Sequence, residues 1–121
     1  QLEQETTRAT IQEFQKDGTL KVVPRESADL ILEVTLKKHS LEPLRYQRDN
    51  NTTPNEYRVA IKAVLTLKRR ATQEVLLKAI EVTGETTFFL TTDIGAAQRT
   101  SLPLAAKDMA HHIVENVVEY W

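Results

Sequence analysis

The stretch from Asp29 to Leu67 predicts a long β-hairpin with one apolar face. Its first arm is DLILEVTLKKH (29–39), its second arm is EYRVAIKAVLTL (56–67), and turn-forming residues lie between them. Side chains of a strand point alternately to its two faces, so apolar residues at every second position indicate one buried face. The alternating apolar residues are Leu30, Leu32, Val34 and Leu36 in the first arm and Tyr57, Val59, Ile61, Ala63, Leu65 and Leu67 in the second.

The connection between the two arms is expected to contain one irregularity and the hairpin tip. Pro43 has no backbone N–H group, which favours a bulge at that position, with residues 44–46 still extended. The tip is predicted at residues 49–55, where asparagines and a proline favour a turn. The arms would then project beyond the body of the sheet.

The segment before the hairpin predicts a helix followed by a short strand. LEQETTRATIQEFQKDG (2–18) has a rough apolar stripe at helical spacing, and Gly18 is a natural left-handed C-cap. LKVVP (20–24) then predicts a short strand, and its closing proline favours a position at the edge of the sheet.

The segment after the hairpin predicts a third long strand. A turn at RRATQ (69–73) leads into EVLLKAIEVTGETTFFL (74–90). The residues expected on its buried face are Leu76, Ile80 and Val82. Lys78 falls in the same phase, so a bulge or register shift is expected beside it, and Gly84 favours a second irregularity.

The C-terminal segment SLPLAAKDMAHHIVENVVEYW (101–121) predicts an amphipathic helix. Its apolar residues recur at a spacing of three and four: Leu102, Ala106, Met109, Ile113 and Val117. Residues 91–100 are expected to form a loop, with Ser101 as the N-cap and Pro103 in the first helical turn. Packed on the apolar face of the hairpin, this stripe predicts an α+β two-layer sandwich, with two helices on one face of a mainly antiparallel sheet of three or four strands.

Composition and charge limit the classes of function. The chain has 121 residues, 40% of them hydrophobic and 27% charged, which is typical of one folded domain. A net charge of −1 gives no general attraction to nucleic acid, so any basic site must be a local patch. No apolar run approaches the roughly 18 residues of a membrane span. Because the chain has no cysteine, disulfides, thiolate metal sites and cysteine nucleophiles are excluded.

The outward phase of the predicted strands mixes basic, polar and apolar residues. It is either a solvated face with scattered apolar side chains or a surface that another molecule covers, and the pattern leaves both open. Basic residues on this face and at the strand ends could hold phosphate through charge-assisted hydrogen bonds. The candidates are Lys37, Arg58, Lys62, Lys68, Arg69 and Arg70, and Lys38 and Arg45 belong to the same wider basic set.

Residues able to carry catalysis are few. His111 and His112 are adjacent on the predicted helix and point about 100° apart, so they cannot jointly hold a metal. His111 and Glu115 form an i, i+4 pair that could hold an ion weakly, but a solvated helix face is the simpler interpretation. The sequence contains no glycine-rich phosphate loop, no nucleophile elbow and no HExxH motif. We therefore predict no catalytic residue, no cofactor and no metal site.

Five short motifs occur in a characteristic order: ADLILE (28–33), LEPLRY (41–46), NEYRV (55–59), GETTFF (84–89) and AKDMAHHIVE (106–115). In this order they resemble the LptE-type lipopolysaccharide-assembly lipoproteins, and the resemblance covers nearly the whole chain. The motifs are packing and turn features, not a catalytic signature. Members of this family typically begin with a lipidated cysteine and a further strand, so we expect residues 1–121 to be a single LptE-like domain without that anchor and first strand.

The resemblance implies a non-enzymatic protein on the periplasmic side of the Gram-negative outer membrane. Such proteins are held there by the lipid anchor, plug the large β-barrel subunit LptD, assist its assembly and bind lipopolysaccharide as it is delivered outward. In the family, lipopolysaccharide contacts are attributed to basic residues near the sheet, which is the role we expect for the six candidates. The alternatives are a small-ligand or lipid carrier with a pocket between helices and sheet, and an enzyme.

Overall fold

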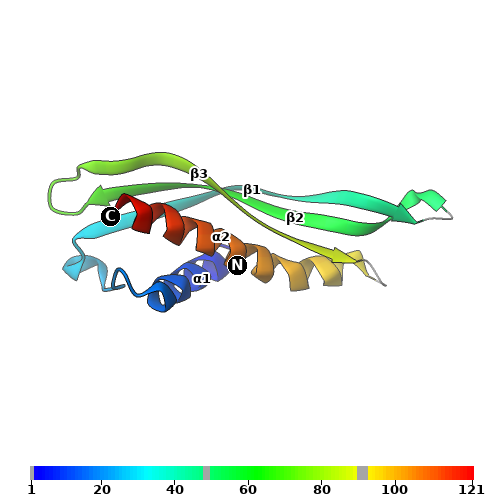
Figure 1. The fold of residues 1–121 in the computed structure, drawn as a ribbon, viewed down its shortest axis with the longest axis horizontal. Helices are drawn as coiled ribbons and strands as arrows, with labels where there is room; N and C mark the ends of the chain where they lie inside the picture. The colour runs from blue at the N-terminus through cyan, green and yellow to red at the C-terminus, as the bar shows by residue number, and fades with distance from the viewer. Residues whose placement is uncertain (1, 48–49, 90–92) are drawn as a thin grey trace.

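Two helices cover one face of a three-stranded antiparallel sheet in the described part of the chain, which is the predicted α+β arrangement (Figure 1). The computed structural model describes residues 2–47, 50–89 and 93–121, with side chains given outside residues 45–54. The elements are α1 (Leu2–Asp17), the 3₁₀ helix η1 (Arg25–Ser27), β1 (Leu30–Gln47), β2 (Asn50–Arg69), β3 (Val75–Phe89) and α2 (Ile94–Tyr120).

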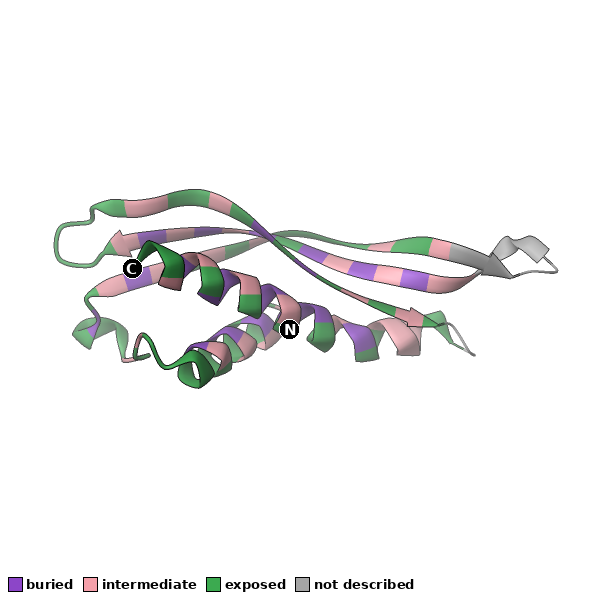
Figure 2. Cartoon of the chain, in the orientation of Figure 1, coloured by how far each residue is buried: buried purple, intermediate pink, exposed green. Residues whose placement is uncertain are grey.

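The predicted hairpin is formed by β1 and β2, and its inner face is buried as expected. β2 is the central strand, and Leu32 of β1 lies opposite Leu67 of β2 on the face that meets the helices. The inner residues of β2 with at most 1% exposure are Val59, Ile61, Ala63 and Leu65. In Figure 2, buried segments alternate with less buried ones along this strand. The alternation of apolar residues therefore predicted the face correctly.

Register shifts interrupt the strands at two of the three predicted places, near Pro43 and near Lys78. In β1 the pairing shifts between Pro43 and Arg45, and between β2 and β3 it shifts from Leu65 to Leu67, close to Lys78. Strand pairing extends further toward the tip than predicted, because β2 already begins at Asn50. Of the tip predicted at residues 49–55, residue 49 lies outside the described residues. A further shift in β1, between Leu36 and Lys38, was not predicted.

The irregularity in β3 changes which of its residues continue the inner face. Ala79 has a φ of 51°, and its amide donates a hydrogen bond to Thr66 Oγ1 at 3.3 Å. Beyond this point Leu77 lies opposite the buried Leu67, so Leu77 takes the inner position that alternation assigned to Leu76. Both leucines are partly buried against the core. Alternation from Leu76 would place Leu77 on the outward face, and this is wrong, because an inserted residue reverses the phase of everything beyond it.

Gly84 does not mark an irregularity, contrary to the prediction. It pairs in regular register with Ile61 and is buried beneath α2. A Cβ at this position would overlap the carbonyl oxygen of Ala105 and the backbone nitrogen and Cβ of Met109. Glycine is therefore required here by the close approach of the helix, and not by the conformation of the strand.

The first helix ends as predicted, but the strand expected after it is not formed. Gly18 has a φ of 80°, and its amide donates to the carbonyl of Phe14 at 2.9 Å, which closes α1. Residues 20–24 have no strand pairing. The carbonyl of Pro24 instead accepts the amide of Ser27 at 3.0 Å, so the chain turns through η1 before it could align with β1.

The second helix begins earlier than predicted. Asp93 is its N-cap, and Oδ1 of this residue accepts the amide of Gly95 at 2.9 Å, so Ile94–Thr100 are helical and not loop. Pro103 lies inside the helix and Ser101 is buried, which corrects their assignment to the first turn and the cap. The packed face of α2 centres on Ala105, Ala106, Met109, Ile113 and Val117, all at most 2% exposed. Neither helix of the described chain has the length and apolarity that crossing a membrane requires.

Candidate functional site

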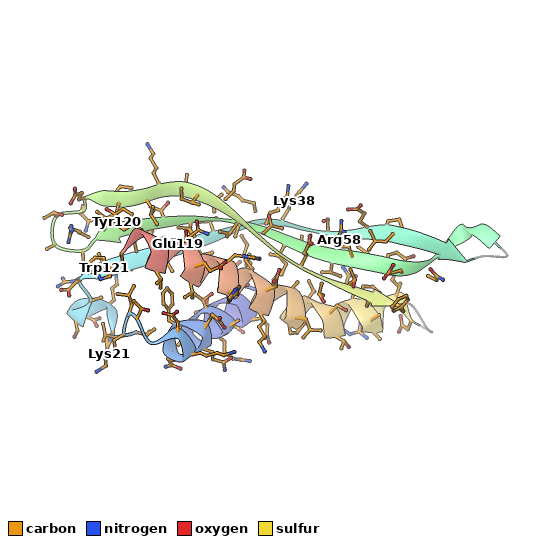
Figure 3. All side chains as sticks on the ribbon, in the orientation of Figure 1. Lys21, Lys38, Arg58, Glu119, Tyr120 and Trp121 are labelled. Atoms are coloured by element: carbon orange, nitrogen blue, oxygen red, sulfur yellow. The ribbon has the colours of Figure 1, made fainter. Side chains whose placement is uncertain are left out.

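Neither α1 nor α2 covers the sheet face turned away from them, here called the outer face (Figures 1 and 3). Along the central strand its residues are Arg58, Ala60, Lys62, Val64, Thr66 and Lys68. They alternate with the buried inner residues, and cations alternate with small or apolar side chains among them. Along β2 the outer face therefore combines cations with small and apolar side chains.

Two of the six candidate basic residues are held in ion pairs on the outer face. Arg58 lies between Glu42 of β1 at 4.0 Å and Glu85 of β3 at 3.8 Å. Lys68 contacts Glu33 at 3.2 Å. Such pairs contribute little to stability where they are exposed, but they neutralise the cation. Arg58 and Lys68 are thus less available to an anionic ligand than the sequence indicated.

Arg69 and Arg70 instead brace the turn between β2 and β3. Nε of Arg69 donates to Glu74 Oε1 at 3.1 Å, and Nε of Arg70 donates to the carbonyl of Ala28 at 2.7 Å. Arg70 also gives its amide to the carbonyl of Asp29 at 3.0 Å, which ties the turn to the start of β1. At about 3.3 Å per residue this turn lies roughly 25 Å from Lys62, so the six candidates do not form one site.

The remaining two candidates, Lys37 and Lys62, are brought together and joined by Lys38. Leu36 pairs with Ala63 and Lys38 pairs with Lys62, so β1 has one extra residue and both lysines stand opposite Lys62. We call Lys37, Lys38 and Lys62 the lysine cluster. Strict alternation would separate Lys37 from Lys38, which is why the sequence did not single out Lys38. Figure 3 shows Lys38 on the side of the sheet away from the helices.

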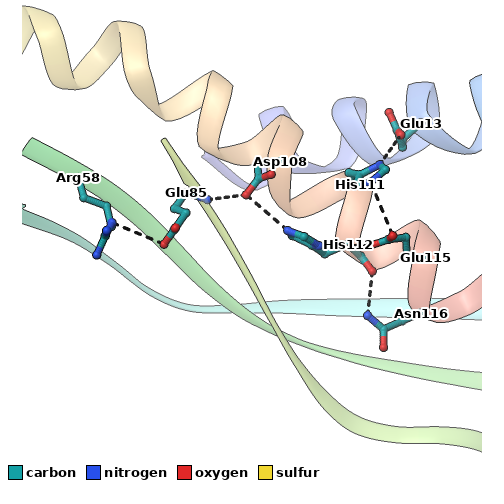
Figure 4. A network of polar contacts seen from close by, with 8 residues as sticks. All are labelled: Glu13, Arg58, Glu85, Asp108, His111, His112, Glu115 and Asn116. Atoms are coloured by element: carbon teal, nitrogen blue, oxygen red, sulfur yellow. Dashed lines mark hydrogen bonds and ion pairs between the residues drawn. The ribbon is translucent and has the colours of Figure 1, made fainter. Parts of the chain in front are cut away.

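A chain of polar contacts links the sheet to both helices (Figure 4). Beyond Arg58, the amide of Glu85 donates to Asp108 Oδ2 at 2.9 Å, and Asp108 contacts His112 Nε2 at 3.6 Å. His112 and His111 both approach Glu115, at 3.3 and 3.7 Å. Among the described residues, no three acidic or histidine side chains are arranged to hold a metal ion. These contacts connect β2 and β3 of the sheet with α2 and α1.

His111 connects the two helices through Glu13. Its Nδ1 lies 3.2 Å from Glu13 Oε2, and the side chain of Glu13 is only 17% exposed. The hydrogen bond to Glu13, and then the charges of Glu115, Glu13 and Asp108, raise the pKa of His111 above its ordinary value. A raised pKa means that the folded state favours the protonated imidazole.

The His111 contact predicts a pH-dependent part of the stability. Its stabilisation is fully present below the ordinary pKa of about 6.5 and is lost as the pH rises through the raised value. In urea unfolding from pH 5.5 to 8.5, we expect His111→Gln to cost most at the acidic end and progressively less toward the alkaline end. Glu13→Gln should give the same trend, and the double variant should cost less than the two changes added. A pH-independent cost of His111→Gln would contradict this assignment.

A groove of about 930 Å³ runs between α1 and β1. Its walls include Thr10 and Phe14 of α1, Leu32 and Val34 of β1, and Trp121 at the C-terminal end. Oγ1 of Thr6, which also lines it, is buried and has no hydrogen-bond partner within residues 2–47, 50–89 and 93–121. The groove therefore offers both apolar contact and an unused polar group.

Comparisons with known proteins agree with this architecture. The family model LptE, described as lipopolysaccharide-assembly, matches residues 1–119. A search among curated proteins gives no match. A protein of Caulobacter crescentus CB15 assigned as a lipoprotein aligns over 96% of this chain and 80% of its own, with 11% identity and a TM-score of 0.65. The rare lipoprotein B of Shewanella oneidensis aligns over 95% and 83%, with 15% identity and a TM-score of 0.52.

At these identities the two structures support the fold alone, whereas the family model spans almost every residue. The matched residues include α1, β1, β2 and β3 and all but the last residue of α2. The chain therefore belongs to the LptE lipopolysaccharide-assembly family.

Proposed function

We propose that this protein is a non-enzymatic outer-membrane lipoprotein component that plugs and helps assemble the LptD barrel and binds lipopolysaccharide during its transport to the outer leaflet. The observation that carries the proposal is the match of the LptE family model to residues 1–119. The uncovered outer face supports it, because a partly apolar and basic sheet surface suits burial against a larger partner. The protein acts from the periplasmic side, where a lipid anchor holds it to the membrane.

Within this function, Lys37 and Lys62 are the strongest of the six candidates for lipopolysaccharide contact. Both lie away from the core and without an acidic partner among the described side chains. Arg58, Lys68, Arg69 and Arg70 remain proposed contacts of lower weight, because each already makes an ion pair or a backbone hydrogen bond.

Co-purification tests the proposal directly. The full-length lipoprotein, tagged and expressed at its natural level, is expected to isolate together with LptD from outer membranes under mild detergent. An unrelated lipoprotein with the same tag is the control for carry-over of abundant barrels. Absence of LptD from the native extract would reject the barrel partner, and absence of lipopolysaccharide binding by the purified complex would reject the second half of the function.

The groove between α1 and β1 favours a second candidate function, a carrier of a small amphipathic ligand or lipid. About 930 Å³ is enough for a lipid chain or a drug-sized molecule, and the walls are partly apolar. This function predicts a bound small molecule when the protein is transferred gently from cell extract into native mass spectrometry. Phe14→Trp, which would fill part of the groove, should reduce the fraction of protein that carries it. A spectrum of the unliganded mass alone would count against the carrier.

A further inference from the structure

We propose that the lysine cluster of Lys37, Lys38 and Lys62 is one anion site, which takes a phosphate group of a phosphorylated glycolipid on the outer face. The inference rests on the proposed function, because lipopolysaccharide is the phosphorylated glycolipid which that function supplies. It adds the position of the site, the three residues that form it and the chemical group they bind.

The bulge in β1 is what assembles the site. Directly opposed residues on neighbouring antiparallel strands have Cβ atoms about 5 Å apart, and in a bulge two residues oppose one. Here Lys37 and Lys38 oppose Lys62, and all three side chains are exposed. The long lysine stems can therefore bring three ammonium groups to a single phosphate, each donating to a different oxygen.

The charges of the cluster are not balanced within the described side chains. Among the side chains that the structure describes, no carboxylate lies within ion-pair distance of the three lysines, whereas Arg58 and Lys68 on β2 are both paired. Lys62 lies opposite Thr83 of β3. The acidic residues of β3 lie two positions before and after Thr83: Glu81 is opposite Val64, and Glu85 forms an ion pair with Arg58. Like charges directly opposed across strands destabilise a sheet, so this arrangement calls for an external anion.

Protection of a sheet edge explains only part of the cluster. β1 is an edge strand of the described sheet, and lysines and bulges on such strands prevent edge-to-edge association. That accounts for Lys37 and Lys38. It does not account for Lys62, which lies on the central strand, where a neutral residue would protect the edge equally well and would remove the repulsion. Edge protection therefore explains Lys37 and Lys38, and it is the addition of Lys62 that produces an anion site.

The surroundings of the cluster favour a glycolipid over a free phosphate ion. Ala60 and Val64 flank Lys62 on the same face of β2, and both are partly exposed. A ligand with a phosphate beside sugar or acyl groups can use this low, partly apolar surface together with the cations. A free anion would gain nothing from it.

The test measures binding of lipopolysaccharide to the 121-residue chain at low ionic strength, where surface charge acts most strongly. We expect the triple variant Lys37→Gln, Lys38→Gln, Lys62→Gln to bind about tenfold or more weakly, since it loses several charge-assisted hydrogen bonds. The control Lys16→Gln, Arg99→Gln, Lys107→Gln changes the net charge equally at exposed positions on the helices and should bind like the unmodified chain. Chemically dephosphorylated lipopolysaccharide should not distinguish the triple variant from the unmodified chain.

Each other outcome overturns the proposal in a recognisable way. Equal affinity of the triple variant and the unmodified chain would reject the site and leave the proposed function intact. No lipopolysaccharide binding by the unmodified chain would reject both. Displacement by an equal phosphate concentration of inorganic pyrophosphate would identify a free-anion site. Loss of LptD association with unchanged lipopolysaccharide affinity would assign the lysines to the protein partner. The triple variant should melt no lower than the unmodified chain, and if it does, Lys62→Gln alone should still weaken binding severalfold.

Discussion

Replacement of Gly84 by alanine is expected to lower the free energy of unfolding by about 3 kcal/mol, at the upper end of overpacking effects. The added Cβ would overlap the Ala105 carbonyl and the backbone of Met109, and backbone atoms cannot rotate away as a side chain can. Nor can α2 move outward at low cost, because Asp108 of the helix accepts the amide of Glu85, next to Gly84, at 2.9 Å. Without this overlap the change would stabilise by about 0.4–1 kcal/mol, since alanine reduces the entropy of the unfolded chain.

Thermal and urea unfolding measure this effect, and Gly95→Ala is the matched control. A Cβ at Gly95 would meet Asp93 Oδ1 at 3.4 Å and Arg99 Nη1 at 3.5 Å, which are ordinary contacts. We expect its stability to stay within about 0.5 kcal/mol of the unmodified protein or to rise, because alanine is favoured over glycine in helices. Gly84→Ala should melt roughly 10 °C lower. Equal behaviour of the two variants would show that α2 does not cross β3 as closely as described.

The elements that sequence could predict are those fixed by the burial of one face. The alternation in EYRVAIKAVLTL (56–67) leaves only one register that buries the apolar set, so the inner face of β2 followed directly. The stripe that includes Met109 and Ile113 likewise fixed the packed side of α2. In both cases the apolar area removed from water outweighs any local preference of the backbone.

Sequence failed where two local signals competed or where a residue was inserted. Ser101 and Pro103 together imitate a helix start, but the Asp93 cap begins α2 earlier and the helix tolerates the internal proline. Residues 20–24 have strand-like composition, yet the chain turns at Pro24, with five residues between it and the Gly18 cap, and these residues do not pair with β1. The face of Leu77 could not be predicted either, because β3 contains an inserted residue that a pattern of alternating residues does not reveal.

The sequence predicts which residues of the candidate site are charged, but it does not predict which of them lie close together in the fold. The acids that neutralise Arg58 and Lys68 lie on other strands, and only the register of the sheet brings Glu42, Glu85 and Glu33 to them. The opposite holds for the lysine cluster, which exists because the pairing shifts by one residue at Lys37. The register of the strands therefore decides which cations have an acidic partner, and no single segment of the sequence shows that register.

Leu65→Ala is expected to destabilise the protein by about 3 kcal/mol, whereas Val64→Ala, one residue away, should cost less than about 1 kcal/mol. Leu65 has 0% exposure and belongs to the main core cluster with Ile113 and Met109, so truncation leaves a cavity that the helix above it cannot fill. Val64 points to the outer face, lies opposite Thr35 and Glu81, and is already partly in contact with water. Its truncation removes little buried area and creates no enclosed cavity.

The pair of variants also tests the proposed function, because only one of the two faces changes its surroundings on binding. In the isolated chain the difference between Leu65→Ala and Val64→Ala, measured by urea unfolding, should be at least about 2 kcal/mol. If the outer face is covered in the complex with LptD, Val64→Asp should weaken that association while leaving the isolated chain folded, since the complex would have to remove a carboxylate from water. Similar costs for Leu65→Ala and Val64→Ala would contradict the register, whereas unchanged association of Val64→Asp would mean that the barrel does not cover this part of the sheet.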